Sequence, residues 1–450
     1  MNRMTGSNDG THILVIPYQA PGHMLPLLDL THQLAKRGLT ITILVTPKIL
    51  PQLQPLLSVH PSIQTLVIPF PPHPTIPDGV EDMKELPVSM VPELLTSMSE
   101  FYNPVLRWFQ ANPSPPVALL TDFFHSTWSQ SLASHLGIRR IGFAPINTGG
   151  LLETWCNLGR VTDEYLPDSM AHNIVANVRS WGFILSSFTE LESENLEQLR
   201  KMMGHDRVWA VGPLLPIEHS KVGLNERGGS NSVPANEVLA WLDSCRADKS
   251  VVFVGFGSQI SLTKPQMEAL ATALEESSVR FIWSVKSPMQ GLKETSGDGE
   301  VPAGFEDRVG GRGLVIRGWA PQVAILKHRA VGIYLTHCGW NSALEGLLNE
   351  VFLLVWPMQA DHFVNAKLLV DQLGAAIRVC DGMSSVPDSA KLAHALAESV
   401  TGNAAEKAQA LKLRERALNA TKEGGSSALA LDELVKELII FDIALHKVKG

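Results

Sequence analysis

Residues 13–45 read ILVIPYQAPGHMLPLLDLTHQLAKRGLTITILV, and the order of patterns in this stretch indicates the fold class. It begins with a short apolar run, Ile13–Pro17, which is typical of a buried strand. From Met24 to Lys36 the apolar residues recur at helical spacing, and Gly38 ends that helix. Thr40–Val45 is a second apolar run. A strand, a helix and a strand in succession predict a βαβ unit with parallel strands.

The same alternation runs through most of the chain, with one interruption. Before it, the expected strands are Ile13–Pro17, Thr40–Val45, Thr65–Ile68, Val117–Leu120, Arg140–Phe143, Phe183–Ser186 and Arg207–Val211. After it, they are Val251–Phe256, Val279–Val285, Leu314–Arg317, Gly332–Thr336, Val351–Trp356 and Ala375–Val379. The interruption, Lys221–Asn236, is rich in glycine and serine and has no apolar periodicity, as is typical of a linker. The sequence therefore predicts two α/β domains.

We place the N-terminal domain at residues 1–236, with the linker at about 221–236, and the C-terminal domain at residues 237–427. Residues 428–450 are expected to form an amphipathic helix that packs back on the N-terminal domain. Ligands of open α/β sheets bind outside the carboxyl ends of the strands. A cleft between the two domains is therefore the expected site.

The composition of the 450 residues excludes several classes of protein. Hydrophobic residues make up 45% and charged residues 18%, which excludes a disordered chain. The net charge of -8 argues against a nucleic-acid binder. Four cysteines without a CxxC pair indicate neither a disulfide scaffold nor a zinc ribbon. Apolar runs are short of the roughly 18 residues of a membrane helix, so we expect a cytoplasmic protein without stable membrane insertion.

Residues 319–362 contain the densest group of polar and aromatic side chains. Here the expected strand Gly332–Thr336 turns into a helix, and His337, Asn341 and Ser342 lie at the turn. Free backbone N–H groups and the positive end of the helix dipole make such a turn an anion site suited to phosphate. Glu345, about one turn further on, could accept two ribose hydroxyls. An ordinary capping box over Ser342–Glu345 explains part of the pattern equally well.

Four neighbouring residues also bear on the site, and two explanations remain open for Trp319 and for the pair Asp361-His362. Trp319 precedes a proline and offers a flat surface to a nucleotide base, or it only covers the core. Trp340 in a polar turn is expected to be exposed, which packing alone does not explain. Asp361 and His362 lie in a loop after a strand, where a carboxylate beside an imidazole suits sugar hydroxyls. A solvated loop pair is the alternative for those two residues.

A histidine and an aspartate far apart in the sequence form a second candidate group. His23 lies in the loop between the first expected strand and helix, and Asp122 follows the strand Val117–Leu120. Both positions lie at the carboxyl edge of the N-terminal sheet, so the side chains can meet. A carboxylate on one imidazole nitrogen fixes the tautomer and raises the basicity of the other. Because the chain has 15 histidines, a structural histidine is the alternative from spacing alone.

These motifs resemble the signature box of the plant secondary-product UDP-glycosyltransferases. The match comprises W-x-P-Q, H-C-G-W-N-S-x-x-E and a terminal D-H, over 44 residues without a gap. Further matches cover most of the chain, namely Pro21–His23, Thr121–Phe123, Ser186–Glu192, Val211–Leu214 and Phe256–Ser258. The resemblance implies an α/β protein of the GT-B fold, in which two Rossmann-like domains face a central cleft. It also implies a UDP-sugar as co-substrate, with no metal and no resident cofactor.

The resemblance assigns a role to each matching residue. Trp319 would stack on uracil, Gln322 would help to hold uracil or ribose, and Glu345 would bind the ribose hydroxyls. The residues expected at the diphosphate are Ser258, His337, Asn341 and Ser342, and those expected at the sugar are Trp340, Asp361 and His362. His23 would be the general base, oriented by Asp122. An acceptor oxygen would then attack the anomeric carbon opposite UDP, with inversion, while the turn stabilises the leaving diphosphate.

The end of the box bears on the donor sugar. Family glucosyltransferases mostly end it in glutamine, whereas this chain has His362, as do members that use galactose, arabinose or rhamnose. Glu350 and Phe352 replace the usual glycine and proline, which alters either a turn facing the cleft or only the packing. Runs such as SVVFVGFGSQI and LVIRGWAPQ resemble the flavonol 7-O-rhamnosyltransferases. We therefore expect transfer from UDP-rhamnose to a flavonol 7-hydroxyl, with UDP-glucose or UDP-galactose and another phenolic as the alternative.

The acceptor pocket is expected in the N-terminal domain, where aromatic and apolar residues suit a flat phenolic molecule. The candidates are Met24, Phe123, Phe124, Trp128 and Asn147, with the segments near Val88–Met98 and Leu151–Trp155. Ordinary core packing explains each of them equally well. Because the family is mostly monomeric, the resemblance implies a monomer whose partners are the donor and the acceptor.

Other classes of protein fit less well. A dinucleotide dehydrogenase needs G-x-G-x-x-G, but Gly255–Ile260 ends in isoleucine where the third glycine belongs. A serine hydrolase needs G-x-S-x-G, which Ser258 does not satisfy. A non-catalytic UDP-sugar-binding protein is the alternative from outside enzymology, and the presence of His23 and Asp122 argues against it.

Overall fold

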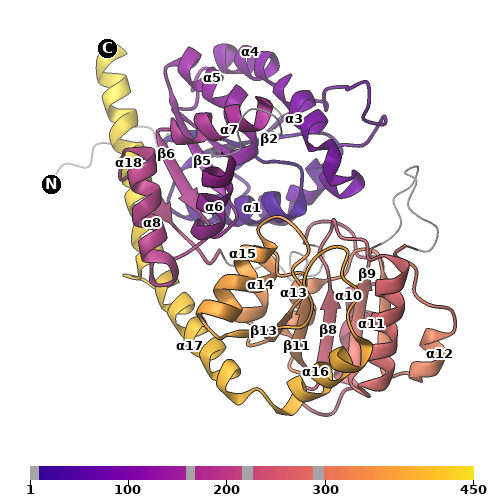
Figure 1. The fold of residues 1–450 in the computed structure, drawn as a ribbon. Helices are drawn as coiled ribbons and strands as arrows, with labels where there is room; N and C mark the ends of the chain where they lie inside the picture. Colours follow the sequence, from indigo (N-terminus) through magenta and orange to yellow (C-terminus); the bar gives the residue numbers. More distant parts are fainter. Residues whose placement is uncertain (1–9, 159–167, 215–226, 287–297, 450) are drawn as a thin grey trace.

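The protein consists of two α/β domains that lie one above the other in the computed structural model shown in Figure 1. The structure describes residues 10–158, 168–214, 227–286 and 298–449. Each domain contains one parallel sheet with helices against it. Buried parallel strands need apolar residues on both faces, which explains the continuous apolar runs of the sequence.

The N-terminal sheet has seven strands in the order β3-β2-β1-β4-β5-β6-β7. The strands are β1 (His12–Ile16), β2 (Thr40–Val45), β3 (Gln64–Val67), β4 (Ala118–Asp122), β5 (Arg139–Ala144), β6 (Gly182–Leu185) and β7 (Val208–Ala210). Its α-helices are α1 (Pro21–Lys36), α2 (Gln54–Val59), α3 (Val91–Ser99), α4 (Tyr102–Ala111), α5 (Ser126–Leu136), α6 (Thr148–Leu158), α7 (Asp168–Val178) and α8 (Thr189–Met203). Short 3-10 turns include η4 (Phe123–His125), which directly follows β4.

The C-terminal sheet has six strands in the order β10-β9-β8-β11-β12-β13. The strands are β8 (Val251–Gly255), β9 (Arg280–Val285), β10 (Gly313–Arg317), β11 (Val331–Thr336), β12 (Phe352–Val355) and β13 (Ala376–Arg378). The helices are α10 (Ala235–Asp243), α11 (Lys264–Glu276), α12 (Phe305–Val309), α13 (Gln322–Lys327), α14 (Trp340–Leu348), α15 (His362–Ala366), α16 (Ser389–Thr401), α17 (Ala404–Thr421) and α18 (Ser426–Lys449).

The strands that the apolar runs predict are confirmed within one or two residues, and so is the two-domain class. The capping box predicted at Thr263 also forms, with Gln266 as its partner, and opens α11. Helix α1 begins three residues earlier than expected, at Pro21. Proline suits the first helical position because its missing N–H would have no partner there. Of the expected linker, residues 221–226 lie outside the described residues, and α10 already begins at Ala235.

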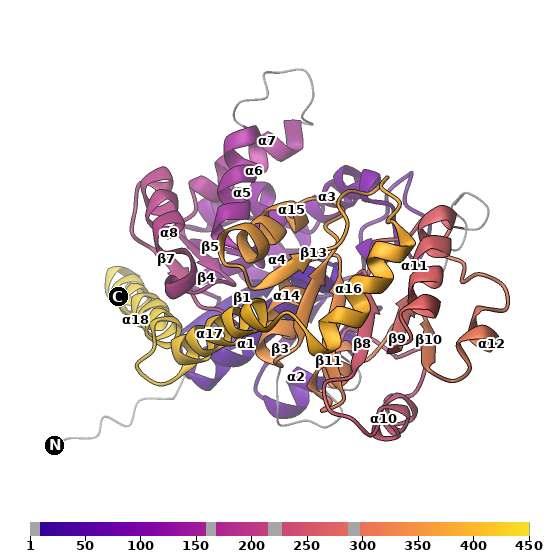
Figure 2. The same ribbon diagram turned by 60° about the horizontal axis from the view of Figure 1, so that its bottom comes forward.

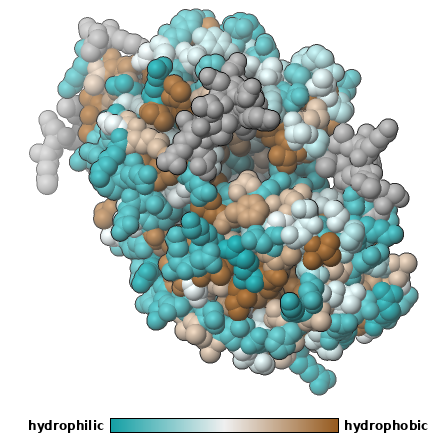
Figure 3. Space-filling model, viewed as in Figure 1, coloured by the Kyte–Doolittle hydropathy of each residue, from teal (hydrophilic) through white to brown (hydrophobic). Residues whose placement is uncertain are grey.

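The last two helices bring the end of the chain back to the N-terminal domain. In Figures 1 and 2, α17 leaves the C-terminal domain and α18 runs beside α8 and β7. The residues of α18 that join the apolar core around β1 and β2 are Leu431, Leu434, Val435 and Leu438. The face in Figure 3 is mostly hydrophilic, with hydrophobic residues in small groups. Within the described ranges, no helix is long and apolar enough to cross a membrane.

The two sheets place their functional loops at one cleft. Helix α1 follows β1, η4 follows β4, and α14 follows β11, so all three begin at carboxyl ends of parallel strands. The N-termini of α1 and α14 meet across the domain boundary, where the Nδ2 of Asn341 donates a hydrogen bond to the carbonyl of Gly22 at 2.5 Å. The residues next to Gly22 and Asn341 therefore face one another.

Candidate active site

His23 and Asp122 form a hydrogen-bonded pair at the carboxyl edge of the N-terminal sheet. His23 lies in the first turn of α1, not in the loop before it, because that helix begins at Pro21. Its Nδ1 lies 2.9 Å from Oδ2 of Asp122, which is fully buried. The other carboxylate oxygen accepts the backbone N–H of Phe124 at 2.9 Å. A carboxylate fixed in this way holds the proton on Nδ1, so Nε2 is left as the acceptor.

Aromatic rings surround the His23 imidazole. The rings of Phe123, Phe124 and Tyr18 lie with their centroids 5.6, 5.1 and 5.2 Å from that of His23. The Tyr18 side chain is 1% exposed, and its hydroxyl has no hydrogen-bond partner among the described residues. Burial and the nearby Asp122 raise the pKa of Tyr18, so the hydroxyl stays protonated. The half-buried Phe123 and Phe124 give this group an apolar wall, which suits a flat phenolic ligand.

A buried arginine lies beneath this pair. Arg140 on β5 is 1% exposed and donates hydrogen bonds to the hydroxyls of Thr121 and Ser129 and to the amide oxygen of Asn177. Burial lowers its pKa to about 9, and the charge of Asp122 opposes that shift. Arg140 is thus still a cation at neutral pH, and its charge attracts that of the Asp122 carboxylate.

Two glycines make room for His337 at the turn between β11 and α14. A Cβ on Gly257 would lie 2.7 Å from Nε2 of His337, and a Cβ on Gly339 would lie 2.5 Å from the same atom. Cys338 has a φ of 65° and donates its backbone N–H to the hydroxyl of Thr336 at 3.2 Å. The turn therefore holds the His337 ring at the N-terminus of α14, where the helix dipole and free N–H groups favour an anion.

His337 and His362 lie against each other, at the turn before α14 and at the start of α15. Their ring centroids are 4.5 Å apart with an interplanar angle of 89°. Burial lowers the pKa of both imidazoles, and in His362 the neighbouring Asp361 opposes the shift. Nδ1 of His362 faces the backbone N–H of Gln359 at 3.3 Å, which leaves Nε2 as the N–H donor. Neutral imidazoles therefore offer hydrogen bonds here, not positive charge.

Asp361 occupies the N-cap position of α15, so the pair Asp361-His362 begins a helix and does not lie in a loop as expected. Its Oδ2 accepts the Nδ2 of Asn365 at 2.8 Å, and Asn365 also donates to the carbonyl of Cys338 at 2.8 Å. The Nδ2 of Asn147 donates to the Oδ1 of Asn365 across the domain boundary. Asn147 is fully buried, and its Oδ1 accepts the backbone N–H of Gly150 at 2.5 Å. We therefore reassign Asn147 from the acceptor to the contact between domains.

Gln322, Glu345 and Ser342 form one hydrogen-bonded group beside Trp319. Nε2 of Gln322 donates to Glu345 Oε2 at 2.7 Å and to the Ser342 hydroxyl at 3.2 Å. Oε1 of Gln322 accepts a hydrogen bond from the hydroxyl of the buried Tyr334 at 2.9 Å. Burial raises the pKa of Glu345, against the effect of the nearby Arg227 cation. The carboxylate is thus held in place for a ligand with hydroxyl groups.

The expectation that Trp340 is exposed is wrong. Its side chain is 3% exposed and packs with Leu344 and Leu368. Its indole N–H donates to the carbonyl of Ser186 in the N-terminal domain at 2.7 Å. The tryptophan therefore joins the two domains.

The remaining acceptor candidates divide into two groups. Phe123 and Phe124 are half-buried, stack on each other with centroids 4.4 Å apart, and lie beside His23. Met24 is 1% exposed and belongs to the core, and Trp128 is 8% exposed and donates its indole N–H to Nδ1 of His125 at 3.2 Å. Core packing is thus the better explanation for Met24 and Trp128.

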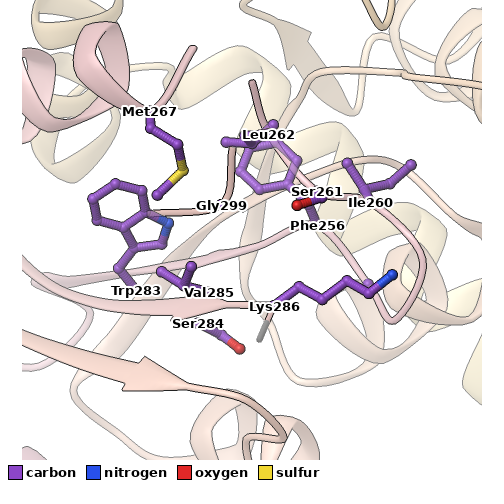
Figure 4. Close-up of a pocket in the computed structure, with 11 residues that line it drawn as sticks. Phe256, Ile260, Ser261, Leu262, Met267, Trp283, Ser284, Val285, Lys286 and Gly299 are labelled. Carbon is purple, nitrogen blue, oxygen red and sulfur yellow. The ribbon is translucent and has the colours of Figure 1, made fainter. Parts of the chain in front are cut away.

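Two cavities lie near these residues. One of about 10 Å³ lies at the carboxyl ends of β8 and β9 and holds one water at most; Gly257 and Ile260 line it, on either side in the chain of the half-buried Ser258. Figure 4 shows the side chains of Met267, Trp283 and Leu262 around it. A second, of about 260 Å³, lies between the domains, and its lining includes Asn341, Glu345 and Arg227. Within the described part of the chain, no three His, Cys, Asp or Glu side chains are grouped to hold a metal ion.

Sequence reasoning missed three residues of the site, namely Tyr18, Arg227 and Asn365. Tyr18 lies between the first strand and His23, so its place in the chain was a usable signal. Arg227 lies in the segment taken for a linker, and Asn365 lies after the signature box. Neither of these two is part of a motif. The fold of the C-terminal domain places Asn365 beside Asp361 and Cys338, whereas Arg227 reaches the site through its pair with Asp29 of the other domain.

Comparisons with known proteins agree with this geometry. The family model described as UDP-glucoronosyl and UDP-glucosyl transferase matches residues 163–415. A flavonol 7-O-rhamnosyltransferase of Arabidopsis thaliana is 47% identical over 95% of this chain and 98% of its own. The flavonol 3-O-glucosyltransferase UGT89B1 of the same plant is 44% identical, with 95% and 96% coverage.

Solved structures give the same result. Arabidopsis thaliana UGT89C1 in complex with UDP-L-rhamnose superposes with a TM-score of 0.88, at 47% identity, and covers 96% of this chain and 99% of its own. The same protein in complex with quercetin superposes with a TM-score of 0.85, at 46% identity and 96% and 100% coverage. The fold is therefore GT-B, and the chain belongs to the UDP-glycosyltransferase family. Its relatives include plant enzymes that act on flavonols.

Proposed function

We propose that this protein transfers rhamnose from UDP-rhamnose to a flavonol hydroxyl, the 7-hydroxyl being favoured, with inversion at the anomeric carbon. The observation that carries the catalytic part is the His23–Asp122 pair at the cleft, opposite the N-terminus of α14. We assign no metal or resident cofactor to the reaction, and UDP-rhamnose is its co-substrate.

In this reaction Nε2 of His23 takes the proton of the acceptor hydroxyl. The acceptor oxygen forms a bond to the anomeric carbon while the bond from that carbon to the UDP oxygen breaks. His23 gains a positive charge in this step, and the buried carboxylate of Asp122 stabilises it. Oδ2 of Asp122 lies 2.9 Å from Nδ1 of His23. The negative charge on the departing diphosphate falls on the N-terminus of α14, where Asn341 and Ser342 lie. Phe123 and Phe124 form an apolar wall on which the flavonol rings can stack.

The choice of rhamnose rests on His362 and on the likeness to UGT89C1, which was solved with UDP-L-rhamnose. In this chain the N–H on Nε2 of His362 is a single donor, whereas a glutamine at this position would offer both a donor and an acceptor. A sugar with a 6-methyl in place of a 6-hydroxyl needs fewer partners. A hydroxyl buried without a partner costs about 1–3 kcal/mol, which corresponds to a roughly 5- to 150-fold preference.

A donor competition tests this proposal. The purified protein would receive UDP-rhamnose, UDP-glucose and UDP-galactose together with kaempferol, and the products would be separated by mass. We expect a rhamnoside as the main product, and we expect His362→Gln to shift the product ratio toward hexosides by about 5- to 150-fold. His394→Gln, at an exposed histidine of α16, is the matched control. A hexoside as the main product of the unaltered protein would refute the choice of rhamnose.

A glucosyltransferase is the second candidate, because UGT89B1, a flavonol 3-O-glucosyltransferase, is 44% identical over nearly the whole chain. The same experiment separates the two sugars, and nuclear magnetic resonance of the product separates the hydroxyl positions. A non-catalytic UDP-sugar-binding protein is the third candidate. His23→Ala distinguishes it, since an enzyme would lose turnover in that variant and keep its affinity for UDP.

A further inference from the structure

Arg227, in the segment between the two domains, forms a buried ion pair with the N-terminal domain. Its Nη1 and Nη2 lie 2.8 and 2.6 Å from the two carboxylate oxygens of Asp29 on α1. The Asp29 side chain is 2% exposed and that of Arg227 15%. Two parallel hydrogen bonds fix the plane of the guanidinium as well as its position. The third nitrogen, Nε, therefore has a defined direction.

That third nitrogen is directed toward the donor site. Nε of Arg227 is buried, makes no hydrogen bond within the described part of the chain, and lies 3.8 Å from Oε1 of Glu345. The other oxygen of Glu345 accepts the Gln322 amide at 2.7 Å. The carboxylate is thus approached from both sides, by α13 and by the segment between the domains. A distance of 3.8 Å is too long for a hydrogen bond, so Oε1 keeps its capacity to accept one from a ligand.

The same segment is attached to Trp319. The indole N–H of Trp319 donates to the backbone carbonyl of Arg227 at 2.9 Å. A Cβ on Gly228 would lie 2.5 Å from the indole ring, and the φ of Gly228 is +81°, so only glycine fits there. The backbone N–H of Ser232 donates to the carbonyl of Trp319 at 2.9 Å. Arg227 therefore cannot move away without also disturbing Trp319.

We propose that Arg227, held by Asp29, is a positioning residue of the nucleoside subsite that sets the Glu345 carboxylate for the two ribose hydroxyls of a UDP-sugar. The inference rests on the proposed function, from which it takes the ribose-binding role of Glu345. It adds the segment between the domains to the donor site. Arg227 acts through Glu345 and Trp319, and it takes no part in the transfer step.

The charges around Glu345 give this role a pH signature. Burial and the Asp29 carboxylate raise the pKa of Glu345, while Arg227 and the Gln322 hydrogen bond lower it. Tyr334 also lies nearby, and burial raises the pKa of its phenol, so it stays neutral. Lys327 of α13 and Arg414 of α17 line the same cavity, and Arg414 is paired with Glu350 at 3.0 Å.

When Arg227 is removed, the opposing effect of its cation is lost, so Glu345 would become protonated at a higher pH. A protonated carboxyl has less capacity to accept hydrogen bonds from two hydroxyls. Binding of UDP should therefore weaken at neutral pH and recover as the pH rises. A residue that only stabilised the fold would not produce this recovery.

Titration calorimetry with UDP tests the proposal, at pH values from 6 to 9, on the full chain. We expect Arg227→Gln to weaken UDP binding about 10-fold at pH 7 and to regain most of that affinity at pH 9. Arg37→Met is the matched control, because it removes an Arg–Asp pair at the end of the same helix, α1, at 2.7 Å from Asp432. Arg37→Met should bind UDP as the unaltered protein does.

The outcomes separate this inference from the function on which it rests. If the unaltered protein binds no UDP, the proposed function fails. If the unaltered protein binds UDP and Arg227→Gln binds it within twofold at every pH, the inference about Arg227 is overturned.

If Arg227→Gln does not fold, the variant Arg227→Lys tests the inference instead. Its ammonium keeps the charge but cannot make the paired contact with Asp29 and face Glu345 together, so a 2- to 5-fold loss without recovery at high pH is expected. Affinity equal to that of the unaltered protein overturns the inference.

Discussion

Asp122→Asn should inactivate the proposed enzyme while its fold and its affinity for UDP remain. The structure determines how the new amide must lie, because the backbone N–H of Phe124 donates to Oδ1 of Asp122 at 2.9 Å. The amide oxygen of asparagine takes that place, so its NH₂ group faces Nδ1 of His23. Nδ1 must then accept a hydrogen bond, and the imidazole proton moves to Nε2. In this tautomer Nε2 has no lone pair with which to take the proton of an acceptor.

The expected magnitude follows from the loss of general base catalysis, which contributes about 10²- to 10⁴-fold. We therefore expect kcat to fall by this factor, or about 2.7 to 5.5 kcal/mol in activation free energy. The assay is initial-rate product formation by mass, together with calorimetry for UDP. Thermal unfolding checks the fold, because Arg140 loses a nearby negative charge but keeps its hydrogen bonds to Thr121, Ser129 and Asn177. Asp432→Asn, at an exposed aspartate, is the control. A kcat within threefold of the unaltered protein, in a folded variant, would refute the reasoning.

Three further substitutions test other parts of the site. Gly339→Ala places a Cβ 2.5 Å from Nε2 of His337, so we expect kcat/KM for the donor to fall at least 10-fold; an unchanged value contradicts the role given to that turn. Trp340→Phe removes the donor to the Ser186 carbonyl, which should lower the free energy of unfolding by about 1–3 kcal/mol in urea titrations. Burial lowers the pKa of His125 from 6.5 to about 4, so the unfolded chain binds the proton first and stability falls as the pH drops from 6.5 to 4. In His125→Gln, about 3 kcal/mol of this loss of stability should disappear. The free energy of unfolding plotted against pH should then be flatter between pH 6.5 and 4. An unchanged slope would contradict the burial argument.

The sequence was sufficient for the strands but not for every helix boundary. Parallel strands buried on both faces read as continuous apolar runs, and these are visible without any tertiary information. The start of α1 was missed because Pro21 and Gly22 look like a loop, although a proline at the first helical position is favourable. The error matters for function, since it moves His23 from a loop onto the first turn of a helix.

Of the site, the residues within one strand–turn–helix unit could be predicted, and those that depend on the meeting of two domains could not. The turn from His337 to Ser342 is a local feature, so its place at the N-terminus of α14 follows from the order of its residues. Trp340 and Asn147 are different, because their partners, Ser186 and Asn365, are 154 and 218 residues away in the other domain. A polar turn predicts an exposed indole, and only the position of the second domain reverses that prediction.

The contacts between the domains bear directly on the chemistry. The proposed base, His23, belongs to one domain and the turn proposed to receive the leaving diphosphate belongs to the other, so the proposed reaction needs their separation to be set within a fraction of an ångström. Gly22 next to His23 accepts from Asn341 of that turn, and Asn147 is joined through Asn365 to Asp361. The first contact therefore connects the residue before His23 to the turn that opens α14, and the second connects the segment after β5 to Asp361. Hydrogen bonds depend on direction as well as distance, so these contacts define one relative position of the two domains. An apolar interface would allow the domains to slide over each other. It follows that neither domain would transfer a sugar alone, even if it folded and the C-terminal domain still bound UDP.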